Sequence, residues 1–431
     1  MTNSWLDRLF KNNRILMANT SSLVITTVAT SGLGFVYWWL AAKMFSVQAV
    51  GVASAAIAAM TLLGFVGKLG FGTLLVGELP WQRSHAGSMI MSALVIVAVI
   101  STILGVLFAY IAPFFSKDLA SLAADGLTIC IFAIGVALTA VTLVFDQAVI
   151  GLLRGDLQLW RNLVFSLVKL LLLPLAARLV GGTGMDIYNT WLWGNITSII
   201  VLVMIFTAQH KKIFFKLDRM FIQQFGRIAL QHHIIDLSLQ ISAFSMPLLV
   251  TIVLSANANA KFYIAWLITS VLFAIPTNLT VMLYALGSAD SNVILAKTPF
   301  TLRISFLVGI FANIVIWLGA YLILSLFGAD YTAAEWPLRI LCLAIFPWTI
   351  RAHYVAIVRA YRQTKRATIL MLLGAGLELV FATVGGIFNG LIGVSIGWLI
   401  AVTIQALIVL PAVYRVSQNQ HYYPVEQLKT S

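Results

Sequence analysis

The chain reads Gly151-Leu-Leu-Arg154-Gly-Asp-Leu-Gln158 after one long apolar run and Ala356-Ile-Val-Arg359-Ala-Tyr-Arg-Gln363 after another. Each stretch places a Gln four residues after an Arg, and the two stretches lie 205 residues apart. Three further pairs repeat at a similar offset: Phe115 and Asp118 with Phe327 and Asp330 (212 residues), Gly184 with Gly393 (209) and Ser46 with Ser255 (209). A near-constant offset within 431 residues indicates two homologous halves.

The composition places both halves in a membrane. Hydrophobic residues make up 61% of the chain and charged residues only 10%, which excludes an ordinary soluble domain. The apolar runs are long enough to cross a hydrocarbon core of about 30 Å as helices. Internal repeats in a protein with many spans are typical of transporters whose substrate site lies between the repeats.

Twelve spans are predicted, six in each half, with both halves entering the membrane in the same orientation. The spans lie near 18–42, 49–76, 87–112, 126–151, 160–180, 187–208, 228–254, 262–286, 300–326, 336–358, 367–388 and 391–414. We therefore expect an all-α polytopic membrane protein with two pseudo-symmetric six-helix lobes around a central cleft. The lobes are expected at 1–209 and 228–431, joined by a basic cytoplasmic linker at 210–227.

The net charge of +13 raises the alternative of nucleic-acid binding. With both termini in the cytoplasm, most of the 27 Lys and Arg residues fall on the cytoplasmic side. This is the positive-inside bias of a membrane protein, so we expect no nucleic-acid partner. The expected location is the cell inner membrane, in contact with membrane lipids. The two cysteines lie in apolar spans and indicate neither a disulfide framework nor a metal site.

Several motifs resemble bacterial polysaccharide-unit flippases of the multidrug/oligosaccharidyl-lipid/polysaccharide exporter superfamily. The first is Phe45-Ser-Val-Gln-Ala-Val50-Gly51, followed by a Gly-rich run from Gly64 to Gly72 and by Gly77-Glu78-Leu79-Pro80. A further motif is Leu326-Phe327-Gly328-Ala-Asp330-Tyr331, before the tenth span. The resemblance implies that the second, fourth, seventh and tenth helices line the central cleft. It also implies a transporter without catalytic residues or cofactors.

Ionisable residues inside spans are the candidate functional groups, because each costs about 2.5–3.5 kcal/mol on insertion scales. Lys68 and Arg351 have no obvious carboxylate partner on adjacent helices, and we expect this pair to clamp a phosphate-bearing substrate. Asp146, Asp236 and Lys169 are candidates for ion coupling or for cleft charge. The alternative for Asp146 and Lys169 is that they pair with one another. Glu378 is expected to serve packing or an inter-helix hydrogen bond at least as readily as function.

Aromatic residues gather near the predicted outer ends of the spans, where anchoring in the interfacial belt is the expected role. They are Tyr37, Trp38, Trp39, Trp191, Trp193, Trp317 and Trp336.

The expected function is flipping of polyprenyl-diphosphate-linked oligosaccharide units by alternating access, for cell-surface polysaccharide such as the O-antigen of lipopolysaccharide. The chain lacks a Gly-x-x-x-x-Gly-Lys-Ser/Thr phosphate loop, so an H⁺ or Na⁺ gradient, or consumption of the product, must supply the energy. A polysaccharide polymerase or glycosyltransferases are the expected protein partners. One alternative is a multidrug or organic-cation antiporter of the same superfamily. Another is a membrane-embedded glycosyltransferase, which the short outer loops disfavour.

Overall fold

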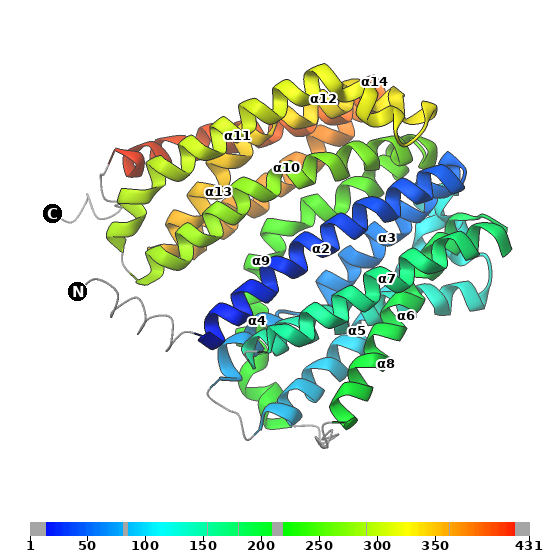
Figure 1. The fold of residues 1–431 in the computed structure, drawn as a ribbon, viewed down its shortest axis with the longest axis horizontal. Helices are drawn as coiled ribbons and strands as arrows, with labels where there is room; N and C mark the ends of the chain where they lie inside the picture. Colours follow the sequence, from blue (N-terminus) through cyan, green and yellow to red (C-terminus); the bar gives the residue numbers. More distant parts are fainter. Residues whose placement is uncertain are drawn as a thin grey trace. The chain divides into compact units, whose positions relative to one another are not determined.

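The structure is a computed structural model that describes residues 14–80, 85–152, 154–179, 181–208, 219–289, 291–361 and 363–418. All regular secondary structure in this part of the chain is helical, which confirms the all-α prediction (Figure 1). Residues 210–218 of the predicted linker (210–227) lie outside the described part of the chain. From Arg219 onward the chain is already helical.

The helices of the first half follow one another with short connections. They are α2 (Arg14–Met44), α3 (Val47–Gly67), α4 (Phe71–Glu78), α5 (Ala86–Phe115), the 3-10 helix η1 (Lys117–Ala123), α6 (Gly126–Gly151), α7 (Gly155–Leu179) and α8 (Gly184–Ala208). Two side-chain caps fix where helices begin. Ser46 accepts a hydrogen bond from the backbone N–H of Ala49 at the start of α3, and Asp125 accepts one from Thr128 at the start of α6.

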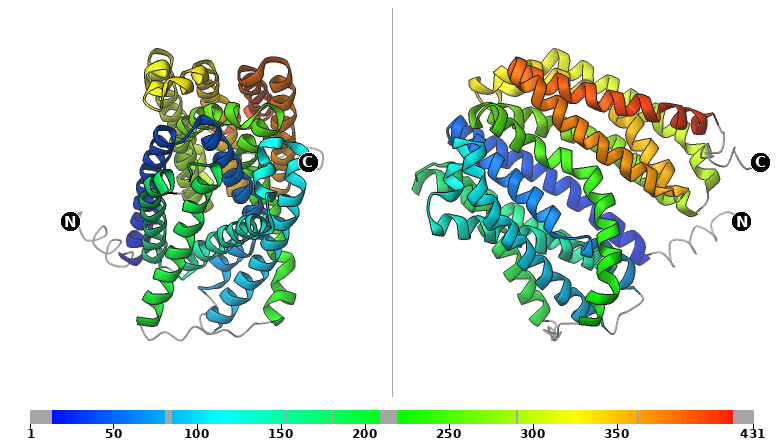
Figure 2. Two further views of the ribbon diagram at one scale, coloured as in Figure 1. Left: turned by 90° about the vertical axis from the view of Figure 1, so that its right-hand side faces the viewer. Right: turned by 180° about the vertical axis from the view of Figure 1, so that it is seen from behind.

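The second half repeats this order. Its elements are α9 (Arg219–Val253), α10 (Ala256–Ala289), α11 (Ser291–Ser325), the 3-10 helix η2 (Ala329–Ala334), α12 (Glu335–Leu343), α13 (Ile345–Ala360) and α14 (Thr364–Ser417). The last of these contains two helices, because Asn389 and Gly390 leave the helical conformation. Figure 2 shows the two halves of α14 in orange and red. They pack closely, since a Cβ on Gly393 or Gly397 would clash with the backbone of Gly385 or Phe381.

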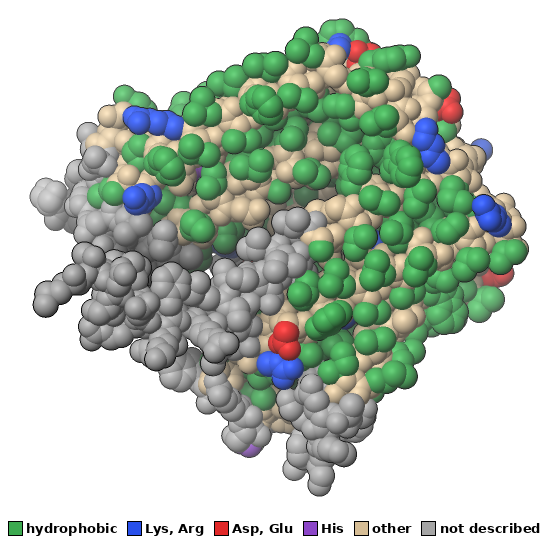
Figure 3. All heavy atoms as spheres, viewed as in Figure 1, with side chains coloured by type: hydrophobic (Ala, Val, Ile, Leu, Met, Phe, Trp, Pro, Cys, Tyr) green, Lys and Arg blue, Asp and Glu red, His purple; other side chains and the backbone are tan. Residues whose placement is uncertain are grey.

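Ten segments of the described chain are long and apolar enough to cross a membrane. One of them contains both halves of α14, and α2 covers the first predicted span. The structure therefore agrees with twelve membrane helices. Large apolar side chains such as Leu107, Leu171 and Leu318 lie exposed on the outside of the helices. Figure 3 shows hydrophobic side chains spread over the described part of the visible face, with few Lys, Arg, Asp or Glu side chains among them, as expected for a surface in contact with lipid.

The chain divides into two compact units, Met1–Leu237 and Ser238–Ser431. This boundary lies inside α9. The sequence predicted that the second lobe begins at residue 228. Ala229 explains this difference, because it belongs to the same buried apolar cluster as Leu75 and Ala148 of the first half. The first turns of α9 therefore pack with the first unit.

Hydrogen bonds at two connections repeat between the halves. The N–H of Arg154 binds the carbonyl of Val149, and the N–H of Gln363 binds that of Val358, 209 residues later. Ser46 and Ser255 each cap a helix at the same offset. The repeat of two homologous halves thus extends to local geometry. The initial pairing of Arg154 with Arg359 is wrong by one helical turn, because this geometry places Arg154 opposite Gln363.

Candidate functional site

The second span breaks between α3 and α4. Leu69 and Gly70 both adopt positive φ angles, 48° and 76°, so the i to i−4 ladder of α3 ends and α4 starts in a new direction. The break at Lys68-Leu69-Gly70 lies within the Gly-rich run from Gly64 to Gly72. Positive φ at a residue such as Leu69 costs free energy and persists only where the surroundings hold it.

A side chain at Gly70 is excluded both by its φ angle and by α9. A Cβ there would overlap the carbonyl oxygen of Ala229 and lie 2.9 Å from the backbone nitrogen of His233.

We expect Gly70→Ala to lower the free energy of unfolding by about 2–4 kcal/mol, because alanine is strained in the left-handed conformation and because its Cβ overpacks the contact with α9. Heating detergent-purified protein and measuring the remaining folded fraction tests this. Gly77→Ala in α4 is the matched control, because nothing lies within 4 Å of its Cβ and helix propensity makes the change neutral to slightly stabilising. Equal stability of the two variants would contradict the argument.

Lys68 lies at this break and is paired. Its Nζ is 3.3 Å from Oδ2 of Asp236 on α9, and Thr73 of α4 donates a hydrogen bond of 2.8 Å to the same oxygen. The ammonium also lies 4.0 Å from the ring centroid of Phe65. The Lys68 side chain is 5% exposed and that of Asp236 is 23% exposed. The carboxylate therefore neutralises a cation that is almost fully buried, while keeping some exposed surface itself.

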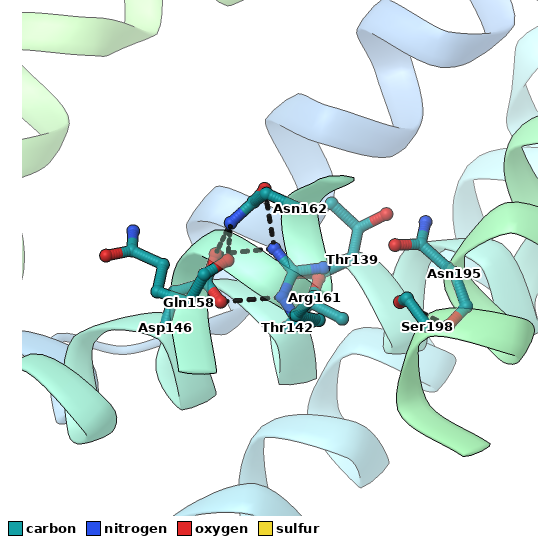
Figure 4. Close-up of polar contacts among 8 residues, drawn as sticks. All are labelled: Thr139, Thr142, Asp146, Gln158, Arg161, Asn162, Asn195 and Ser198. Carbon is teal, nitrogen blue, oxygen red and sulfur yellow. Dashed lines mark hydrogen bonds and ion pairs between the residues drawn. The ribbon is translucent and has the colours of Figure 1, made fainter. Parts of the chain in front are cut away.

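Asp146 forms a second charged cluster, together with Arg161 and Asn162 (Figure 4). Arg161 Nε donates to Asp146 Oδ1 at 2.6 Å, and Asn162 Nδ2 donates to Oδ2 at 3.1 Å. The pair joins the end of α6 to the start of α7 across the turn that carries Arg154. In that turn, an exposed hydrogen bond from Arg154 to Asp156 raises the pKa of the guanidinium. Asp146 is thus committed to a buried bidentate ion pair.

Lys169 of α7 has a different environment. The side chain is 4% exposed, and its Nζ lies 3.8 Å from the ring centroid of Trp191, 4.5 Å from that of Phe165 and 5.0 Å from that of Tyr37. Three aromatic rings surround the ammonium, from α2, α7 and α8. Each such contact contributes about 0.5–2 kcal/mol to a cation.

The second unit contains a network centred on Glu378 of α14, which is 1% exposed. Glu378 Oε1 accepts hydrogen bonds from Arg351 of α13 and from Gln405 (2.9 Å), while Oε2 accepts from Ser242 (2.5 Å) and Trp398 (2.8 Å). Arg351 also stacks on Trp348, with 4.3 Å from Cζ to the ring centroid. Glu378 therefore makes the inter-helix hydrogen bonds that its sequence position suggested.

Three sequence-based expectations about these charges are wrong. Lys68 and Arg351 are not unpartnered cations, because Asp236 and Glu378 neutralise them. Asp146 does not pair with Lys169, since Arg161 takes its carboxylate. Arg161 itself escaped notice because its position at the start of a span suggested a cytoplasmic cation.

Two of the predicted belt aromatics are also internal. Tyr37 is 0% exposed and Trp38 is 2% exposed. The interfacial role fails for these two because both are buried: the Tyr37 ring packs edge-on against Trp191 of α8, and Trp38 packs against Tyr37. Trp193, Trp317 and Trp336 are exposed, as a belt role requires.

Residues 16–286 match the family described as polysaccharide biosynthesis protein. The chain belongs to this family. The resemblance seen in its motifs is thereby confirmed for most of the chain. No curated protein sequence matches the chain.

Solved structures with the same fold include a lipid flippase and multidrug transporters. The lipid II flippase MurJ in an inward closed conformation is 14% identical, with a TM-score of 0.71 over 92% of this chain and 90% of that chain. An inward-facing multidrug resistance MATE transporter of the MOP superfamily is 18% identical, with a TM-score of 0.66 over 93% of this chain and 98% of that chain. At these identities the likeness establishes the fold of this family member, which is the predicted twelve-helix architecture.

Proposed function

We propose that the chain flips polyprenyl-diphosphate-linked oligosaccharide units from the inner to the outer leaflet of the cytoplasmic membrane, by alternating access. The match of residues 16–286 to a polysaccharide biosynthesis family carries the proposal. The fold shared with a lipid II flippase supports it, because lipid II names a lipid substrate. The product serves assembly of a cell-surface polysaccharide such as O-antigen, with polymerase or glycosyltransferases as partners.

The role proposed for Lys68 changes with its pairing. The diphosphate of the substrate replaces Asp236 as the ionic partner of the Lys68 ammonium. The Asp236 side chain is partly exposed. Arg351 likewise exchanges Glu378 for a phosphate group in this proposal. Four hydrogen-bond donors, Arg351 among them, hold Glu378 in place. Charge-assisted hydrogen bonds to phosphate are among the stronger ones, so exchange of partners is feasible.

The alternative of an organic-cation antiporter rests on the likeness to a multidrug transporter. Its substrates need carboxylates that are free to receive a cation. Asp146, Asp236 and Glu378 are each paired with an Arg or Lys. The pairing of these three acids favours the flippase.

Cells that lack the protein test the proposal. We expect lipid-linked oligosaccharide to accumulate on the cytoplasmic side, and expression of the wild-type chain to restore export. Resistance to cationic dyes is measured in the same strains. Normal distribution of the lipid-linked intermediate together with altered dye resistance would replace the flippase by the antiporter.

A further inference from the structure

Lys169 is an ionisable residue of a predicted span, and it takes part in none of the ion pairs described above. Asp146, Asp236 and Glu378 have their basic partners in Arg161, Lys68 and Arg351. No ion pair joins Lys169 to an acid within the described ranges. Its amine is enclosed by aromatic rings and not by carboxylates.

Titratable groups on the helices that pack against α7 have partners of their own. Tyr37 of α2 hydrogen-bonds to Thr190 at 2.7 Å and to the carbonyl of Ile187 at 3.2 Å. On α8, Asp186 accepts hydrogen bonds from Thr183. On α6, Asp146 is bound by Arg161 and Asn162.

The repeat makes this environment unusual. At the offset of 209 residues, Lys169 corresponds to Glu378, so each half has a buried ionisable group at the same position. Arg351, which neutralises Glu378, corresponds to Thr142 in the first half. An uncharged residue therefore stands where the second half supplies a counter-ion. The first half retains a buried base with no fixed partner.

The helix faces that carry Lys169 and Trp191 also carry polar groups nearer the α6–α7 turn. Arg161, Phe165 and Lys169 share one face of α7 at i, i+4 and i+8, while Trp191, Asn195 and Ser198 share one face of α8. In Figure 4, Thr139 and Thr142 lie near Arg161, Gln158 lies beside Asp146, and Asn195 and Ser198 lie to one side on α8. The Oε1 atom of Gln158 is buried with no hydrogen-bond partner among the described residues.

We propose that Lys169 is the proton-binding residue that couples transport to a proton gradient. The neutral amine takes a proton from a hydronium ion, which leaves an ammonium and a water molecule, and later returns the proton to water. The ammonium is held by the faces of Trp191, Phe165 and Tyr37. The coupling part of this inference rests on the proposed transport function.

The chemistry of the site selects a proton over a metal ion. Na⁺ and other hard cations bind to oxygen ligands, above all carboxylates. The group at the centre here is an amine, which repels a metal ion when charged and accepts a proton when neutral. The ring faces stabilise a charged ammonium by cation–π contact and offer no oxygen ligand.

A pH titration of tryptophan fluorescence tests the site directly, with the full-length protein in lipid nanodiscs. Trp191 reports on Lys169, since an ammonium appears 3.8 Å from its ring centroid. We expect wild-type emission to change with pH, and Lys169→Met and Trp191→Phe to lose that change. Trp193→Phe is the matched control on the same helix, because Trp193 is 55% exposed and its removal should preserve the change.

Two outcomes overturn the site: a wild-type protein without a pH-dependent change, or a Lys169→Met protein that retains it. Size-exclusion profiles identify variants that fail to fold, and Lys169→Arg then replaces Lys169→Met because a guanidinium keeps its proton. In cells, Lys169→Arg is expected to accumulate lipid-linked oligosaccharide to the level of the deletion strain. Normal export by Lys169→Arg would overturn the coupling role. Because the titration needs no lipid-linked substrate, it separates failure of this site from failure of the proposed function.

Discussion

Glu378→Ala is expected to lower the free energy of unfolding by about 3–5 kcal/mol. The substitution leaves the Arg351 guanidinium in the interior of the second unit without its carboxylate, and breaking a buried ion pair from one side costs about this much. Ser242 and Trp398 lose the carboxylate oxygen to which they donate, and Gln405 loses one of its acceptors in the same step. The expected result is a steep fall in the amount of folded protein recovered from membranes and in its apparent Tm.

The controls separate the buried charge from the loss of side-chain volume. In Arg351→Met with Glu378→Met, both charges are replaced by apolar groups, and we expect recovery of most of the lost stability. Glu335→Gln breaks a more exposed pair with Arg339, one helical turn apart, and is expected to change stability by no more than about 0.5 kcal/mol. Similar losses in Glu378→Ala and Glu335→Gln would contradict a buried network.

The helices and the repeat were predictable because they depend on local properties of the sequence. Apolar runs of sufficient length identify the spans, and the short turn at Asn389-Gly390 that divides α14 was visible as a Gly-containing connection. The register of the repeat was harder to predict. An Arg with a Gln four residues later is a weak motif, and it gave an offset of 205 residues between the halves. The matching backbone hydrogen bonds at Arg154 and Gln363 give an offset of 209 residues, which differs by one helical turn.

The partners of the buried charges were not predictable, because they depend on packing between distant segments. Lys68 and Asp236 are 168 residues apart, and Arg351 and Glu378 lie on different helices. The sequence identified these residue types as costly in a membrane, which was correct. The sequence does not show how each helix is rotated about its own axis relative to its neighbour. This rotation decides whether Lys169 contacts Asp146 or an aromatic ring.

Lys68→Met is expected to reduce export of lipid-linked oligosaccharide by about tenfold to about a hundredfold. Charge-assisted hydrogen bonds contribute about 1.5–3 kcal/mol, and each 1.4 kcal/mol corresponds to a factor of ten. The same substitution also leaves Asp236 with Thr73 but without Lys68 as a hydrogen-bond donor, so reduced export also follows if Lys68 only neutralises Asp236. The rate of appearance of lipid-linked oligosaccharide in the outer leaflet is the measurement.

Lys68→Met combined with Asp236→Asn decides between the two roles. The double variant has no unpaired buried charge, so its stability should return toward that of the wild type. If Lys68 binds the diphosphate, export stays low in the double variant although the protein is folded and present at normal levels. If Lys68 only neutralises Asp236, export recovers together with stability. Full recovery of export would therefore remove Lys68 from the substrate site and leave the α3–α4 break as a purely structural feature of the first unit.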